Sequence, residues 1–172
     1  AALKAAGFPG MSTTFCKAPF DFLGDTLRGT RAIMLDLYRR PEKVVEACEA
    51  YVPILVRDLT RACDQRGLTT AMFPLHKGAD SFMSQEQFDT YYWPTLKATM
   101  LGLWEEGISS YMFVEGSYDN RLETIEEMPE GSTAWWFDQT DMEHVHEVLG
   151  DKFTIAGNVP ASLMSTGSVE DL

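Results

Sequence analysis

The sequence is poor in cysteine and in basic residues, and both shortages narrow the kinds of protein it can be. Its three cysteines, Cys16, Cys48 and Cys63, are far apart and include no CxxC pair. Neither a disulfide framework nor a cysteine-rich zinc site is therefore predicted. Only 14 basic residues face 26 acidic ones, for a formal net charge of -12. Such a chain repels a phosphate backbone, so we expect no nucleic-acid partner.

Long apolar runs are also missing. No run approaches the roughly 20 residues that cross a bilayer, and the N-terminus lacks the basic-then-apolar layout of a signal peptide. There is no internal repeat, no low-complexity tract and no linker rich in Pro, Gly or Ser. With 45% hydrophobic and 23% charged residues, the composition is typical of a globular protein with one core. We expect a single domain over residues 1–172, in the cytoplasm and without a membrane partner.

Several common sequence signatures are absent as well. There is no GxGxxG, no Walker loop, no GxSxG and no HExxH. The chain therefore lacks the usual signals of a dinucleotide-binding protein, a P-loop nucleotidase, a serine hydrolase and a zinc protease.

Helices and strands are predicted to alternate along the chain. Apolar positions three and four apart predict a helix over Pro41–Arg66, which Gly67 ends. A capping box of Ser84 and Gln87 begins another, which Pro94 should kink and Gly107 should end. The other predicted helices are Ala1–Ala6, Leu122–Glu127 and Met142–Leu149, and the predicted strands are Met11–Cys16, Leu68–Leu75, Ile108–Val114, Thr133–Phe137 and Lys152–Ala156.

This alternation, over short connections, predicts a parallel α/β sheet with helices outside it. The sheet is either doubly wound or closed as a barrel. About five strands can be counted, whereas a closed (β/α)8 barrel needs roughly 250 residues. The chain begins within a predicted helix and ends at 168–172 on what resembles a helix start. We therefore expect a fragment whose flanking parts are missing.

Candidate functional residues are the polar ones that directly follow a strand, because active sites of parallel α/β folds lie at the carboxyl ends of the strands. Five places qualify. They are Cys16-Lys17 with Asp21 and Asp25, His76-Lys77, Glu115 with Tyr118 and Arg121, Asp138 with Asp141, and Asn158.

Glu115 is the strongest of these candidates for a functional residue. A carboxylate that ends the run Tyr111–Val114 should be partly desolvated, and hence proton-sharing, cation-paired or metal-bound. Arg121 is its candidate partner, and a buried structural ion pair is the alternative explanation. Asp138 and Asp141 are either a base with its orienting group or helix caps. For Asp141 we favour the cap.

Among the histidines only His76 follows a strand. It is a candidate general base or ligand, and the alternative is a hydrogen-bonded structural residue. His144 and His146 lie two apart on a predicted helix and so face different directions. Trp135 and Trp136 are adjacent in a strand, so one side chain should point into the barrel and the other towards the helices.

Four stretches of the sequence resemble the uroporphyrinogen decarboxylase superfamily, which also contains corrinoid-dependent methyltransferases. They are Ala18-Pro19-Phe20 running to Gly29, Met83–Phe88 leading to Trp93-Pro94, the turn Glu115-Gly116, and Gly157–Pro160 leading to Thr166-Gly167. The resemblance implies a TIM-like barrel, of which this chain is the middle and later part. It also implies a homodimer.

The sequence departs from the superfamily at functional positions. Asp25 stands where true decarboxylases have a substrate-binding tyrosine, and Gly78 where a serine contacts the porphyrinogen. Loss of these hydrogen-bonding groups argues against decarboxylation of that substrate. Phe113-Val114-Glu115 replaces the His-x-Cys pair of the zinc-dependent methyltransferases, which argues against zinc-thiolate chemistry. Glu115 and His76 could hold a metal only if the missing strands of the barrel supplied further ligands.

The leading hypothesis from the sequence is a methyltransferase-like enzyme that moves a methyl group between a small substrate and a corrinoid on a partner protein. Glu115, His76 and Asp138 are the expected catalytic residues, and the expected substrate-binding residues are Lys77, Tyr118, Arg121, Asp25 and Asn158. One alternative is a decarboxylase in which Lys77, Arg121 and Arg31 clamp carboxylates. The other is a barrel without catalysis that serves as a scaffold or as a docking module for a corrinoid protein.

Overall fold

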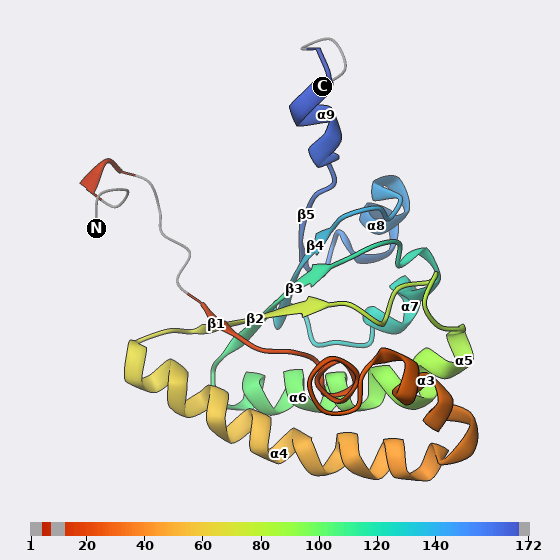
Figure 1. The fold of residues 1–172 in the computed structure, drawn as a ribbon. Helices are drawn as coiled ribbons and strands as arrows, with labels where there is room; N and C mark the ends of the chain where they lie inside the picture. The colour runs from red at the N-terminus through yellow and green to blue at the C-terminus, as the bar shows by residue number, and fades with distance from the viewer. Residues whose placement is uncertain (1–4, 8–12, 169–172) are drawn as a thin grey trace.

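The computed structural model describes residues 5–7 and 13–168, and its centre is one five-stranded sheet (Figure 1). The strands lie in the order β1-β2-β3-β4-β5, and every neighbouring pair is parallel. Their bounds are Thr14–Phe15 for β1, Thr70–Leu75 for β2, Ser109–Val114 for β3, Thr133–Phe137 for β4 and Thr154–Ala156 for β5. The predicted α/β fold class with parallel strands is confirmed.

Helices connect the strands. Between β1 and β2 lie α2 (Pro19–Phe22), the π-helical turn η1 (Leu23–Leu27), α3 (Thr30–Arg39) and α4 (Pro41–Arg66). The later ones are α5 (Gln85–Gln87), the π-helical turn η2 (Phe88–Tyr92), α6 (Trp93–Glu105), the 3₁₀ turn η3 (Asp119–Arg121), α7 (Leu122–Ile125), α8 (Met142–Leu149) and α9 (Ala161–Thr166). Long helices α4 and α6 lie side by side against one face of the sheet (Figure 1). No helix within the described residues is both long and apolar enough to cross a membrane.

Several predicted elements have the predicted bounds, namely α4, β4 and α8. Strands β2, β3 and β5 begin one or two residues later than predicted and end where predicted. Only Thr14–Phe15 is extended within the strand predicted at Met11–Cys16, whose first two residues lie outside the described part. Most of the predicted helix Ala1–Ala6 and the predicted helix start at 168–172 also lie outside it.

Four helical segments were not predicted, namely α2 with η1, α3, η3 and α9. In α3 only Ile33 and Leu37 are buried, so its apolar periodicity is short. The π-helical turn that follows α2 departs from the 3.6-residue repeat on which the prediction depends.

Helix ends follow the sequence closely. Gly67 ends α4 in the left-handed conformation, with φ 62°. Ser84 and Gln87 form the predicted capping box. A kink was predicted at Pro94, which has no N–H to donate. The structure has the π-helical turn η2 just before this proline, where the Trp93 N–H donates to the Phe88 carbonyl.

Alternate strand residues face the helices and the open side of the sheet. Trp135 is fully buried, whereas Trp136 is 41% exposed, as predicted for adjacent strand residues. The register pairs Leu75 with Val114 and Val114 with Phe137. The next residues along β2, β3 and β4 therefore form a row at the carboxyl edge of the sheet. They are His76, Glu115 and Asp138.

Candidate active site at the carboxyl ends of the strands

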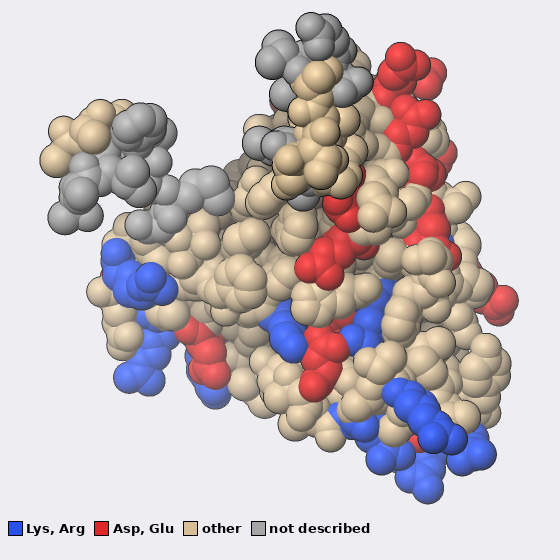
Figure 2. Space-filling view, turned by 45° about the horizontal axis from the view of Figure 1, so that its top comes forward, with Lys and Arg blue, Asp and Glu red and all other residues tan. Residues whose placement is uncertain are grey.

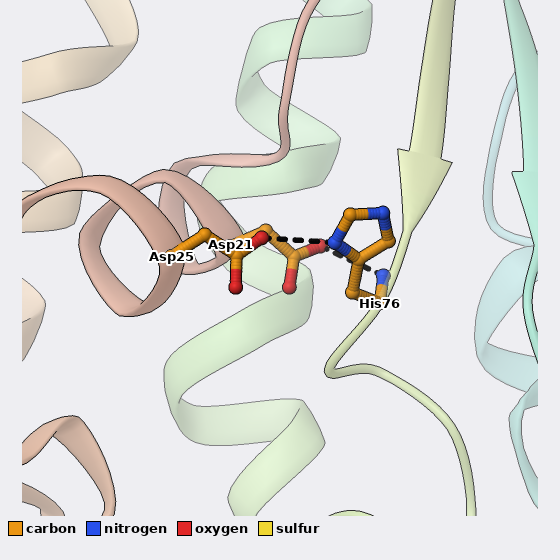
Figure 3. A group of neighbouring side chains, drawn as sticks. All are labelled: Asp21, Asp25 and His76. Atoms are coloured by element: carbon orange, nitrogen blue, oxygen red, sulfur yellow. Dashed lines mark hydrogen bonds and ion pairs between the residues drawn. The ribbon is translucent and has the colours of Figure 1, made fainter. Parts of the chain in front are cut away.

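The imidazole of His76 lies between two carboxylates. Its Nδ1 is 2.8 Å from Oδ2 of Asp25, and its Nε2 is 3.7 Å from Oε1 of Glu115. Figure 3 shows the ring facing Asp25, with Asp21 alongside. A carboxylate can only accept a hydrogen bond, so Nδ1–H is the donor to Asp25 and Nε2 faces Glu115. The structure thus brings together three of the predicted site residues.

Asp25 comes from η1 and binds three positive or proton-donating groups. Besides His76, these are the ammonium groups of Lys17, at 3.0 Å, and of Lys77. Burial acts to raise the pKa of the Asp25 carboxyl, but the hydrogen bonds from Lys77, Lys17 and His76 outweigh it and hold that pKa well below its usual range. Asp25 is therefore ionised at neutral pH.

Because this folded-state pKa lies below the unfolded value of about 3.9, ionised Asp25 stabilises the fold above that pH. The contribution is lost as the pH falls through the folded-state pKa. We expect the free energy of unfolding of the wild type to fall more steeply between about pH 4 and pH 2 than that of Asp25→Asn. Urea unfolding at a series of pH values measures both slopes, and parallel slopes would contradict the ion-pair network.

Lys77 is almost completely buried, with 4% of the residue exposed. Its side chain runs against Gly24, where an added Cβ would lie 2.8 Å from the Lys77 Cε. A side chain at position 24 would therefore displace the lysine. Lys77 was predicted to bind the substrate, and in the structure its ammonium group is directed to Asp25.

Asp21, one helical turn before Asp25, is fully buried. Its Oδ2 accepts hydrogen bonds from the main-chain N–H of His76, at 3.1 Å, and from the Tyr92 hydroxyl, at 2.6 Å. Its Oδ1 accepts from the main-chain N–H of Lys77 at 2.9 Å. Burial raises the pKa of the Asp21 carboxyl, while these donors and the nearby positive charges act in the opposite direction.

The predicted pairing of Glu115 with Arg121 is wrong. Arg121 is 1% exposed and its Nε lies 3.2 Å from Oδ1 of Asp80. Its guanidinium also donates to the Gly78 and Met83 carbonyls and to the Gln85 side chain, and it stacks on the ring of Phe88 at 4.7 Å. Arg121 therefore stabilises residues 78–85, the segment that follows His76 and Lys77, through hydrogen bonds at both of its ends.

Glu115 is also less desolvated than predicted, because 48% of its side chain is exposed. Strand β3 ends at Val114, and the Glu115 side chain lies at the open edge of the sheet. The described partner of its carboxylate is His76.

Tyr118 is fully buried behind the turn after β2. A Cβ added at Gly78 would lie only 2.2 Å from the Tyr118 hydroxyl oxygen and 2.8 Å from Cε1 of Tyr92. The tyrosine hydroxyl therefore occupies the space that a serine at position 78 would need. The absence of a side chain at Gly78 therefore goes together with the inward orientation of Tyr118.

Residues after β4 and β5 hold the neighbouring loops. Asp138 accepts a hydrogen bond from the Gly116 N–H at 3.2 Å and so fixes the turn after Glu115. Asn158 donates to the Thr140 carbonyl at 2.6 Å. Asp141 accepts from the N–H groups of Glu143 and His144, which confirms its predicted role as the cap of α8.

A metal ion does not fit this donor set. Ligand atoms of Asp21, Asp25 and His76 lie within 4.8 Å of one another. The Asp25 oxygens already bind two ammonium groups, and the Asp21 oxygens bind three hydrogen-bond donors. A cation here would be repelled by Lys17 and Lys77. Phe113, which the resemblance placed at the position of a zinc-binding histidine, packs on Trp136 with ring centres 4.5 Å apart.

The buried contacts of Asp21, Asp80 and Tyr92, which support the site residues, were not predicted from the sequence. One signal was available for Asp21, since residues four apart share a face of a helix and Asp21 lies four residues before Asp25. That signal needs a helix over 19–27, which was not predicted.

A parallel sheet flanked by helices, with charged side chains gathered at the carboxyl ends of its strands, is typical of an α/β-barrel enzyme. The family model described as uroporphyrinogen decarboxylase (URO-D) matches residues 11–172. The chain belongs to this family of enzymes, and its five strands are part of the family's TIM barrel. No curated protein matches the chain.

Proposed function

We propose that this chain acts in methyl transfer between a small substrate and a corrinoid carried by a partner protein, with His76 as the group that donates and accepts the proton. The observation that carries the proposal is the position of the His76 ring, held by Asp25 at Nδ1 and facing Glu115 at Nε2. A histidine oriented by one carboxylate, with its second nitrogen at an open edge, is suited to acid–base catalysis.

Methyl transfer needs such a group when the methyl leaves an oxygen, nitrogen or sulfur atom. The bond between methyl and heteroatom breaks and the electron pair stays on the heteroatom, which a proton from Nε2 neutralises. The methyl group, without that pair, would form its new bond to the corrinoid. Asp25 stabilises the imidazolium that carries this proton. Glu115 binds the substrate beside the ring, and Asp138 holds the turn that carries Glu115. The corrinoid acts as the second substrate.

The charges favour a small substrate over a porphyrinogen with several carboxylates. Lys17 and Lys77 are both paired with Asp25, and Arg121 is paired with Asp80. Each of these three cations is therefore already bound to a carboxylate of the protein, which makes it less available as a clamp for substrate carboxylates. In Figure 2, acidic side chains gather over the side of α7 and α8, while basic ones gather near the two ends of α4. A polyanion that entered the site would also be repelled by the carboxylates of Glu115 and Asp138.

Glu115→Gln is expected to lower methyl transfer by about 100-fold while leaving thermal unfolding almost unchanged, because the side chain is 48% exposed. The assay incubates the full-length protein with free cob(I)alamin and a panel of methyl ethers, methylamines and methyl thioethers. Formation of methylcobalamin is followed by its absorbance.

Glu106→Gln, a replacement of an exposed glutamate at the end of α6, is the matched control and should keep the wild-type rate. If Glu115→Gln unfolds the protein, Glu115 is a structural residue. If it folds and keeps the full rate, Glu115 does not bind the substrate.

A further inference from the structure

The helical segment formed by α2 and η1 holds His76 at two points. Asp21 binds the main-chain N–H of His76, and Asp25 binds the Nδ1 of its ring. The two aspartates lie on successive turns of the segment, and Figure 3 shows both beside the histidine. Asp21 therefore fixes the main chain of His76 where it follows β2, and Asp25 fixes the orientation of the His76 ring.

Asp21 is also bound to Lys77, whose ammonium group in turn binds Asp25. The two oxygens of Asp21 thus accept from two successive main-chain N–H groups just after the last residue of β2. Those N–H groups lie beyond the pairing of the sheet, and burial makes an unsatisfied N–H costly. The buried carboxylate is what allows the chain to turn at this point with both side chains directed to Asp25.

We infer that Asp21 is a positioning residue, which sets the His76 ring between Asp25 and Glu115 by fixing the main chain of His76 and Lys77. The inference rests on the proposed role of His76 in proton transfer. Asp21 itself lies beneath the site and is fully buried, so it acts on the substrate only through the two residues that it holds.

Tyr92 offers a way to separate this role from general support of the core. Its hydroxyl, from η2, is the third donor to Asp21 and lies 2.6 Å from Oδ2, the oxygen that also accepts from the His76 N–H. Tyr92→Phe removes that bond and leaves the bonds to His76 and Lys77. Asp21→Asn keeps the shape of the side chain but replaces one acceptor oxygen with an NH2 donor, which cannot accept from a main-chain N–H.

The experiment compares Asp21→Asn, Tyr92→Phe and the wild type by ¹⁵N and ¹H NMR, with thermal unfolding as the check on folding. In Asp21→Asn we expect loss of the hydrogen-bonded Nδ1–H signal of His76. We also expect about tenfold faster amide exchange at His76 or Lys77, and about 100-fold slower methyl transfer to cob(I)alamin. In Tyr92→Phe the Nδ1–H signal and the amide protection should persist.

Retention of the Nδ1–H signal in a folded Asp21→Asn protein would overturn the inference. Equal loss of that signal in Tyr92→Phe would also overturn it, because the effect would then follow from any disturbance of the core. If Asp21→Asn does not fold, the wild-type protein provides the test. The main-chain nitrogens of His76 and Lys77 must then show NMR coupling across the hydrogen bonds to the Asp21 carboxylate carbon, and absence of this coupling would overturn the inference. The NMR outcome does not depend on turnover, so failure of the proposed methyl transfer would be recognised separately.

Discussion

His76→Gln is expected to lower the rate of methyl transfer by a factor of about 10² to 10⁴, the usual contribution of a positioned acid–base group. Glutamine can replace the hydrogen bond to Asp25, but it does not exchange a proton near neutral pH. The His76 side chain is 31% exposed, so its replacement should change the thermal unfolding temperature only slightly. The rate is measured with the full-length protein and free cob(I)alamin under single-turnover conditions.

A second histidine provides the matched control for this prediction. His144 on α8 is 37% exposed and faces Glu123 at 4.0 Å, which is a similar pairing away from the strand ends. His144→Gln should keep the wild-type rate. A His76→Gln protein that is folded and fully active would show that the proton is moved by another group.

Arg121→Leu is expected to destabilise the fold by about 3 to 5 kcal/mol, the usual cost of breaking a buried ion pair from one side. The substitution removes the donors to the Gly78 and Met83 carbonyls and leaves Asp80 without its cation. Urea unfolding gives the free energy of unfolding directly. The double variant Arg121→Leu, Asp80→Asn should recover part of the loss, because no uncompensated carboxylate then remains.

An exposed arginine is the control for Arg121. The Arg57 side chain is 70% exposed and pairs with its neighbour Asp58, so Arg57→Leu should change stability by no more than about 0.5 kcal/mol. If Arg121→Leu were as stable as the wild type and lost only activity, Arg121 would be a substrate-binding residue, as the sequence suggested.

The sequence was sufficient for elements whose periodicity is long or whose ends carry a specific residue. Helix α4 has 26 residues, an apolar face and a left-handed glycine after it, so both its type and its bounds could be predicted. The short strand β2, which lies between Gly67 and Gly78, was also clear. The edge on which the site lies also followed, because the carboxyl ends of parallel strands meet at one edge.

The contacts within the site could not be predicted, because they join residues that are distant in the sequence. Asp25 and His76 are 51 residues apart, and Asp21 and Tyr92 are 71 apart. Both Asp25 and Tyr92 are presented by π-helical turns, which have no clear sequence signal. The error over Glu115 has a related cause. Strand β3 ends at Val114 as predicted, but Arg121, the expected partner, pairs with the distant Asp80, and the Glu115 side chain is left 48% exposed.

The most direct test of the proposed function is a parallel assay of the wild-type, full-length protein in two channels. One contains cob(I)alamin with the panel of methyl compounds, and the other contains uroporphyrinogen. We predict a methyl-dependent change in the cobalamin absorbance and no decarboxylated porphyrin product. Decarboxylation of uroporphyrinogen without methylation of cobalamin would contradict the account, because neither the pairing of Lys17, Lys77 and Arg121 with carboxylates nor Gly78 would then have excluded that substrate.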